Sequence, residues 1–178
     1  MQRPDRQHHL TSPSIEVGPA RPEECAALGA LLVRAYRSVD PPVRDEYAAM
    51  LADVAGRAAD PELVVLAARL DGRPVGCVTI HLADDGQDGA LGTDGVRMRM
   101  LGVDPEVHGS GAGRALAVAV VDTARRLGRD RVLLDTQAHM VAAQAIYASL
   151  GFRRRPERDR TVPGTDVHLM AFELTLER

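Results

Sequence analysis

A chain of 178 residues with 45% hydrophobic and 26% charged residues is long enough to bury a core, and we expect a single domain over residues 14–178. No apolar run reaches membrane-spanning length, so we expect no membrane partner. The formal net charge of −3 lacks the basic balance of nucleic-acid binders, so we expect no nucleic-acid partner either.

The cysteines and the first residues give two further expectations. Cys25 and Cys77 form neither a disulfide framework nor a metal-ligand spacing, which favours a cytoplasmic protein without a metal. Residues 1–13 are polar, contain proline and lack periodicity, so a disordered tail is expected there. The sequence leaves open whether the chain forms a homodimer.

The first half of the chain mixes strand and helix patterns. Residues 14–19 alternate apolar and polar side chains like a strand, and residues 22–39 carry apolar residues at helical spacing. A second helix is expected next, with one face formed by Tyr47, Met50, Leu51, Val54 and Ala58. Residues 63–70 and 74–82 predict an antiparallel hairpin with its turn at 71–73, and residues 83–95 predict an acidic loop.

Residues 96–117, VRMRMLGVDPEVHGSGAGRALA, predict a strand, a glycine-rich loop and a helix. Gly109, Gly111 and Gly113 lack a Cβ, so their N–H groups can approach a bound group at a helix N-terminus, where an anion such as phosphate is favoured. The Rossmann fingerprint fails because Arg114 stands where a third glycine is needed. The P-loop pattern fails because the chain has no lysine.

The segments after the loop predict how the sheet continues. The helix is expected to end near Gly128, and residues 131–136 read as a compact strand. A strand, helix, strand order is a crossover, so the two strands should lie parallel in one sheet. A final strand is expected over residues 167–176, where Met170, Phe172, Leu174 and Leu176 share one face.

Two segments resemble the GNAT superfamily of N-acetyltransferases. The loop frame at residues 108–113 is similar to the family's pyrophosphate signature of Gln or Arg, two residues, Gly, one residue, then Gly or Ala, with His108 at the Gln/Arg position. Residues 133–152 are similar to its second segment, in which Asn, Ala, an aliphatic residue and Tyr precede Gly-Phe. Met140 stands at the Asn position, followed by Ala143, Ile146, Tyr147, Gly151 and Phe152. The resemblance covers roughly residues 14–176.

This resemblance implies a fold and a reaction. The fold would be α/β, with a mostly antiparallel mixed sheet of about six to seven strands, a parallel splayed pair and helices on both faces. The donor substrate would be acetyl-CoA, the partner an amine acceptor, and no metal would be needed. Coenzyme contacts are implied for Leu101, Gly102, Val103, His108, Gly109, Ser110, Gly111, Ala112, Gly113, Arg114, Met140 and Ala143. Tyr147 would be the general acid that approaches the coenzyme sulfur.

Several assignments stay open at this point. The general base is Glu106, Asp135, His139 or a water relay. Arg97 and Arg99 face the same side of their strand and either attract an anionic acceptor or pair with carboxylates nearby.

Two further alternatives concern binding rather than chemistry. Five arginines between residues 153 and 160 either contact RNA or a coenzyme phosphate, or form a solvated strand edge. The leading function is an N-acetyltransferase acting on a primary amine of a small molecule, peptide or protein. The alternative is a catalytically weak domain that holds acyl-CoA as a sensor or assembly module.

Overall fold

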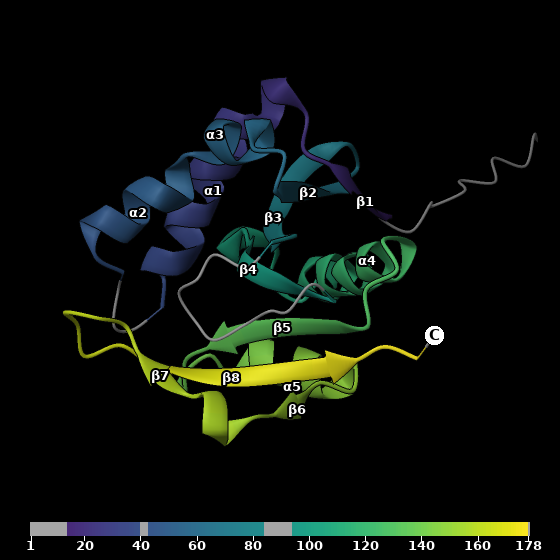
Figure 1. Cartoon of the computed structure of the whole chain (residues 1–178). Coiled ribbons are helices and arrows are strands. Elements are labelled where there is room, and N and C mark those ends of the chain that lie inside the picture. Colours follow the sequence, from purple (N-terminus) through teal and green to yellow (C-terminus); the bar gives the residue numbers. More distant parts are fainter. Residues whose placement is uncertain (1–13, 40–42, 84–93, 178) are drawn as a thin grey trace, which may run out of the picture.

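The computed structural model describes residues 14–39, 43–83 and 94–177, and one mixed sheet organises them (Figure 1). The tail predicted for residues 1–13 and most of the acidic loop predicted for 83–95 lie outside the described residues. The strands are β1 (Ile15–Pro19), β2 (Leu63–Leu70), β3 (Arg73–His81), β4 (Gly95–Val103), β5 (Arg131–Thr136), β6 (Arg153–Arg154), β7 (Arg160–Thr161) and β8 (His168–Thr175). Their order is β1-β2-β3-β4-β5-β8-β6, with β7 beside β8.

The sheet is mostly antiparallel, and β4 with β5 forms its parallel pair, as the crossover predicted. It has eight strands rather than six to seven, because β6 and β7 hold two residues each and leave no pattern in the sequence. The β2–β3 hairpin turns at Asp71 and Gly72, whose φ angles of 50° and 78° suit the right-handed twist of the strands.

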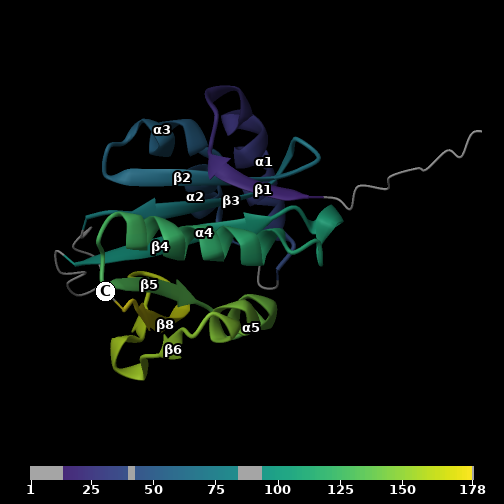
Figure 2. The same cartoon turned by 90° about the vertical axis from the view of Figure 1, so that its right-hand side faces the viewer.

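Helices cover both faces of the sheet, as expected (Figures 1 and 2). A 3₁₀ turn (Pro22–Glu24), α1 (Cys25–Arg37), α2 (Asp45–Ala52) and α3 (Val54–Ala59) lie on one face. On the other face lie α4 (Ala112–Arg126), which Figure 2 shows in front of β3 and β4, and α5 (Val141–Ser149). We call these the α1 face and the α4 face.

The prediction of a single helix from Tyr47 to Ala58 is wrong, because the helix is interrupted at Asp53. Asp53 has φ −80° and ψ 64°, and its side chain accepts a 2.9 Å hydrogen bond from the Gly56 N–H, which starts α3. The break rotates the two short helices relative to one continuous face. Met50 lies within α2 and is 52% exposed although helical periodicity placed it inside, because α2 buries the face of Ala48 and Leu51 instead.

The two faces hold separate cores. The α4 face buries Val96, Met98, Leu116, Val120, Val132, Leu134, Tyr147, Phe152 and Phe172 among others. The α1 face buries Cys25, Leu28, Leu32, Leu51, Val54, Val65, Ala67, Cys77 and Met100. Alternation along each strand sends neighbouring side chains to opposite cores, and the final strand does so as predicted, with Phe172 and Leu176 on the α4 face.

A β-bulge interrupts this alternation in β4. Thr79 pairs with Arg99 and Cys77 with Gly102, so Met100 and Leu101 together oppose the single residue Val78. Met100 takes φ 54°, a conformation uncommon for residues other than glycine. Because of the extra residue, Met98 lies in the α4-face core whereas Met100 lies in the α1-face core.

Candidate active site

The parallel pair separates halfway along β4, which gives this strand an edge that β5 does not cover. The last residues paired between the two strands are Met98 and Leu134, but β4 continues to Val103. The predicted contact residues Leu101, Gly102 and Val103 lie beyond that point. Backbone groups at such an edge can pair with an extended ligand, as an added strand does.

The packing of α1 against β4 requires a residue without a side chain at position 102. A Cβ at Gly102 would lie 2.8 Å from Leu32 Cδ2 and 3.5 Å from both Ala35 Cβ and Tyr36 Cε2. Larger residues would push α1 away from the strand. The side chains of Leu101 and Val103 point the other way and pack on the α4-face core.

The glycine-rich loop presents a row of N–H donors at the start of α4. After a 3₁₀ turn (Pro105–Val107), Gly109 and Gly111 take φ 82° and 87°, with open space where a Cβ would point. Among the hydrogen bonds of the described residues, none uses the N–H groups of Gly109, Gly111, Gly113 or Arg114 as donor. These donors and the positive end of the helix dipole form an anion site, which fits a pyrophosphate.

The other predicted loop residues frame this row of donors. His108 is exposed and ends the 3₁₀ turn, and Arg114 is exposed in the first turn of α4. Ser110 accepts a long, 3.4 Å hydrogen bond from the Ala112 N–H, and Ala112 itself is buried. The buried Ala112 anchors the helix start while the polar groups stay accessible.

Asp104 holds the turn that leads from β4 into the loop. Its Oδ1 accepts a 3.2 Å hydrogen bond from the Glu106 N–H, and its Oδ2 accepts one of 2.7 Å from Arg34 of α1. Burial is the largest single effect and favours the protonated carboxyl, but the hydrogen bonds from Arg34 and Glu106 and the nearby arginine charges together outweigh it, so the pKa of Asp104 lies below its ordinary value. Asp104 therefore stays ionised and ties the loop to α1.

Gly113 is the point at which β4, α4 and α5 meet. A Cβ there would lie 3.5 Å from Val103 Cγ2 and 3.4 Å from Ile146 Cδ1. The glycine loop and the end of β4 therefore meet α5 at one place, although Ile146 follows Gly113 by more than thirty residues in the sequence.

The start of α5 carries the second predicted segment. Met140 precedes the helix, and its sulfur accepts a 3.6 Å hydrogen bond from Thr136 Oγ1 of β5. The Gln144 amide donates to the carbonyls of Gln137 and Ala138 at 2.9 and 3.1 Å and so holds the connection rigid. Ala143 is half-buried one turn before Tyr147, on the same face of the helix.

Tyr147 lies in the α4-face core. It is 6% exposed, and its ring centroid lies 5.8 Å from that of Phe152 and 6.4 Å from that of Phe172. Burial raises the pKa of the Tyr147 phenol to about 12. The Tyr147 phenol is therefore protonated at neutral pH and is able to donate a hydrogen bond.

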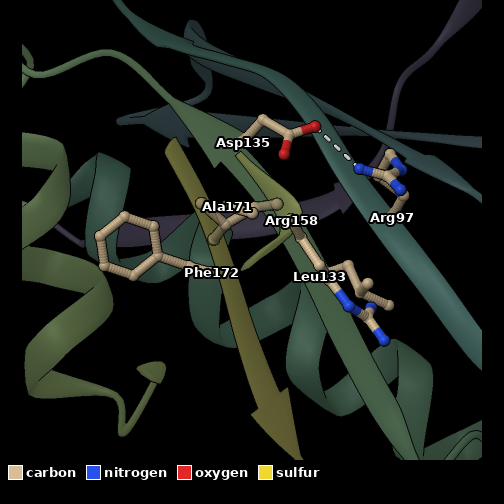
Figure 3. A pocket seen from close by; sticks show the side chains of 7 residues that line it. Arg97, Leu133, Asp135, Arg158, Ala171 and Phe172 are labelled. Carbon is tan, nitrogen blue, oxygen red and sulfur yellow. Dashed lines mark hydrogen bonds and ion pairs between the residues drawn. The ribbon is translucent and has the colours of Figure 1, made fainter. Parts of the chain in front are cut away.

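The two arginines of β4 have different surroundings. Arg97 is 3% exposed, and its Nη1 lies 2.8 Å from Asp135 Oδ2 across the gap between β4 and β5 (Figure 3). Arg160 Nη2 reaches the same oxygen at 3.2 Å. The small cavity beside them, about 10 Å³, holds at most one water molecule. Arg99 is half-buried and acts electrostatically on Tyr36 and Tyr47.

The three candidate bases differ in position. Asp135 already accepts hydrogen bonds from two arginines, whereas Glu106 lies exposed on the 3₁₀ turn and His139 lies exposed before α5. No base is assigned from this geometry.

Four of the five arginines between residues 153 and 160 form ion pairs with carboxylates of this chain. Arg154 pairs with Asp159 at 2.5 Å, and both Arg155 and Arg158 pair with Glu173 of β8, at 2.9 and 3.3 Å. The Arg154 guanidinium also lies 5.5 Å from the Phe172 ring centroid. These contacts favour the structural interpretation of the cluster at the β6 edge.

Sequence reasoning missed Tyr36 and Tyr47, which counted only as apolar positions of helices. Their rings meet edge to face, with centroids 5.9 Å apart, above the end of β4. The available signal was composition, because the chain has only three tyrosines and Tyr147 is the third.

Within the described ranges, no group of three or more His, Cys, Asp or Glu side chains is arranged to hold a metal ion. No helix in this part of the chain is long and apolar enough to span a membrane.

The chain is similar in sequence to members of a known protein family. The family model of the acetyltransferase (GNAT) family matches residues 26–152, more than half of the chain. An aminoglycoside N(6')-acetyltransferase type 1 from Stenotrophomonas maltophilia is 31% identical over 143 residues, covering 80% of this chain and 87% of that protein. The mycothiol acetyltransferase of Thermobispora bispora is 40% identical over 75 residues, and this match spans 42% of the chain but only 24% of that protein.

Solved structures agree on the fold. YncA of Salmonella typhimurium, solved with acetyl-CoA, superposes with a TM-score of 0.65 at 21% identity, covering 92% of this chain and 94% of that one. The two motifs, the splayed sheet and the family match are consistent with one another. The chain therefore belongs to the GNAT family of acetyltransferases.

Proposed function

We propose that the protein transfers an acetyl or short acyl group from acetyl-CoA to a primary amine of a small molecule, peptide or protein. The observation that carries this proposal is the row of unpaired N–H groups at Gly109, Gly111, Gly113 and Arg114, which opens beside the uncovered edge of β4. A pyrophosphate on the loop and an extended amide-containing arm along the strand would use both features.

The donor site divides into three parts. The loop N–H groups, with Ser110 and Arg114, hold the pyrophosphate, and the exposed His108 imidazole offers one more hydrogen bond. Backbone groups of Leu101 to Val103 pair with the pantetheine amides. Met140 and Ala143, at the start of α5, line the other side of the arm. The N–H groups carry most of the contacts, so His108 at the Gln/Arg position is compatible with binding.

Tyr147 supplies a proton-bearing group at the leaving sulfur. Its pKa of about 12 compares with about 8.5 for an ordinary thiol, so full transfer of its proton to a thiolate is uphill by about 5 kcal/mol. We therefore give Tyr147 the role of hydrogen-bond donor that stabilises the departing sulfur. The amine loses one proton as it becomes an amide and the thiolate gains one, so the net reaction needs no proton from solvent.

Substrate binding and turnover test this function in two steps. Acetyl-CoA at one hundred times its Kd should stabilise the folded chain by about 2.7 kcal/mol, which a thermal shift assay detects. A panel of amines with detection of the released thiol then measures turnover. No thermal shift with acetyl-CoA or CoA would reject the proposal.

The alternative, an acyl-CoA sensor without turnover, is favoured only by the lack of an assigned base among Glu106, Asp135 and His139. A thermal shift without thiol release from any amine would support the sensor.

Neither role requires nucleic acid, since four of the five arginines near β6 and β7 pair with carboxylates. Both cysteines are free and buried, which suits the reducing cytoplasm.

The relatives do not agree on an acceptor. Their names give an aminoglycoside, mycothiol and, for a Danio rerio protein 36% identical over 96 residues, N-acetylaspartate. The acceptor class has to come from the side chains of this chain.

A further inference from the structure

Asp104 follows the last residue of β4, and all four of its polar groups are engaged in hydrogen bonds. Its N–H donates to the Val75 carbonyl of β3 at 2.9 Å, and its carbonyl accepts from the Val107 N–H at 3.0 Å. Its carboxylate oxygens accept from the Glu106 N–H and from Arg34 of α1, at 3.2 and 2.7 Å. Asp104 therefore connects three parts of the fold, which are β3, α1 and the 3₁₀ turn before the glycine-rich loop.

Arg34 joins this turn to the helix that also packs on the end of β4. On the same helix, Leu32 Cδ2 lies 2.8 Å from the Cβ position of Gly102. The helix α1 thus contacts two positions that are two residues apart, Gly102 through packing and Asp104 through the ion pair. It holds the strand edge proposed for the pantetheine arm and the turn that leads to the proposed pyrophosphate loop in one fixed relation.

The charge of Asp104 has the wrong sign for the loop that it precedes. The N–H groups of that loop and the start of α4 favour an anion, whereas a carboxylate five residues before Gly109 repels one. The carboxylate accepts two hydrogen bonds and is ionised at neutral pH. An acidic residue at this position therefore opposes the binding of a pyrophosphate unless its charge is compensated and its hydrogen bonds serve the loop.

The Arg34 guanidinium meets both conditions. It lies 2.7 Å from Asp104 Oδ2 and so cancels much of the field of the carboxylate. It also fixes the side chain in the position in which Oδ1 accepts from the Glu106 N–H and starts the 3₁₀ turn. The Arg34 side chain is 56% exposed, so the pair contributes little to global stability. Its effect is local and acts on the loop that follows the turn.

We propose, given the function proposed above, that Arg34 is a positioning residue for donor binding, which holds the glycine-rich loop through Asp104 in the conformation that binds the pyrophosphate of acetyl-CoA. Arg34 acts through the carboxylate and does not contact the phosphates. Without the ion pair the turn samples other conformations, and the apparent Kd rises as the binding-competent fraction falls. The effect therefore appears in the Kd and KM for acetyl-CoA, whereas kcat at saturating acetyl-CoA stays close to that of the wild type.

Substitution of Asp104 in the full chain gives a test in which charge and positioning predict opposite signs. Asp104→Asn removes a negative charge beside an anion site, so charge alone would strengthen acetyl-CoA binding. The proposal expects the Kd measured by calorimetry to rise about tenfold, because the neutral amide holds Arg34 less tightly. Arg34→Gln should raise the Kd by a similar factor. The double variant should bind no more weakly than the weaker single variant, because both changes remove one interaction.

One conservative variant and two matched controls accompany these measurements. Arg34→Lys keeps the positive charge and should recover most of the affinity that Arg34→Gln loses. Arg37 lies one turn later on α1, is 53% exposed and pairs with Asp45 at 3.0 Å, but this pair joins α1 to α2 and does not reach β4. Arg37→Gln and Asp45→Asn should therefore leave the Kd for acetyl-CoA unchanged. Without ligand, the Tm of every variant should fall by less than about 4 °C, which shows that the fold is intact.

The outcomes separate this inference from the proposed function. If the wild-type chain does not bind acetyl-CoA, the proposed function itself fails. If the wild type binds but Asp104→Asn binds as tightly or more tightly, the positioning role is overturned while donor binding stands. A loss confined to Arg34→Gln would then indicate a direct contact between the guanidinium and a phosphate. Losses that add in the double variant, or a fall in kcat without a rise in KM, would also overturn the positioning role.

Discussion

The Arg97 guanidinium and the Asp135 carboxylate bridge β4 and β5 where the two strands begin to separate, with 2.8 Å between Nη1 and Oδ2 (Figure 3). Arg97 pairs in register with Leu133, and Asp135 follows Leu134, the last residue of β5 paired with β4. The ion pair thus replaces the backbone pairing that stops at Leu134. The position of this ion pair marks the point along β4 beyond which β5 no longer covers the strand edge.

Breaking this bridge should cost stability. Asp135→Asn leaves the buried Arg97 opposite a neutral amide, and we expect the free energy of unfolding to fall by about 2–4 kcal/mol, measured by urea denaturation. Asp122→Asn is the control, because Asp122 pairs with Arg125 on an exposed helix face and should contribute under about 1 kcal/mol. Equal losses in the two variants would contradict the role given to the bridge.

The glycine loop allows a test in which strain and binding are separated. Gly111→Ala places a Cβ at φ 87° in open space, so it should cost about 1–2 kcal/mol of stability and weaken acetyl-CoA binding about tenfold or more. Gly164→Ala imposes a similar strain at φ 72°, also in open space, but lies outside the loop. It should lower stability to a similar extent and leave the Kd for acetyl-CoA unchanged in calorimetry.

Tyr147→Phe should lower kcat at least tenfold while changing KM for acetyl-CoA by less than threefold, because only the hydrogen bond to the leaving sulfur is lost. Since burial raises the Tyr147 pKa to about 12, the phenol stays protonated and should cause no decline in kcat below about pH 11. Steady-state rates between pH 6 and 10 measure both effects. A wild-type decline near pH 10 that Tyr147→Phe abolishes would show an ordinary phenol instead.

Cys77 should make the fold sensitive to alkali. Burial raises the pKa of its thiol from 9.0 to about 12, so above pH 9 the unfolded chain loses this proton first. The stabilisation is complete below pH 9 and is lost as the pH rises through 12, at up to about 1.4 kcal/mol per pH unit. Urea unfolding of the wild type should therefore show about 1.4 kcal/mol less stability at pH 10 than at pH 8.

Cys77→Ala is the comparison for that measurement. This variant should be less stable at pH 8, because it leaves a small cavity in the α1-face core, but it should lose little between pH 8 and 10. An identical pH dependence in the two proteins would mean that another group controls the alkaline limb.

Much of the fold follows from local patterns in the sequence. The limits of β5 were predicted to the residue, since Arg131 and Thr136 bound a short apolar run, and the crossover dictated its parallel pairing with β4. The glycine-rich loop before α4 was predicted because glycine spacing is a local signal. The helix that carries Tyr147 also lies in a segment whose motif is contiguous in the sequence.

The arrangement on the α1 face could not be predicted in the same way. Tyr36 and Tyr47 come from two helices, and their meeting depends on the packing of α1 over Gly102 and on the break at Asp53. The difference between Arg97 and Arg99 depends on where β5 leaves β4. Such relations arise only from tertiary packing, and no residue pattern along the chain records them.

Because of the bulge at Met100, the direction in which each side chain at the end of β4 points depends on the number of residues in the strand as well as on their identity. Gly102 faces α1 and Val103 faces α4, whereas regular alternation from Met98 would reverse both. Deleting Leu101 would leave Met100 alone opposite Val78 and so remove the bulge; Gly102 would keep its place opposite Cys77, but the Met100 side chain would turn from the α1-face core to the α4-face core. The end of β4 therefore accepts changes of side chain far more readily than changes of length.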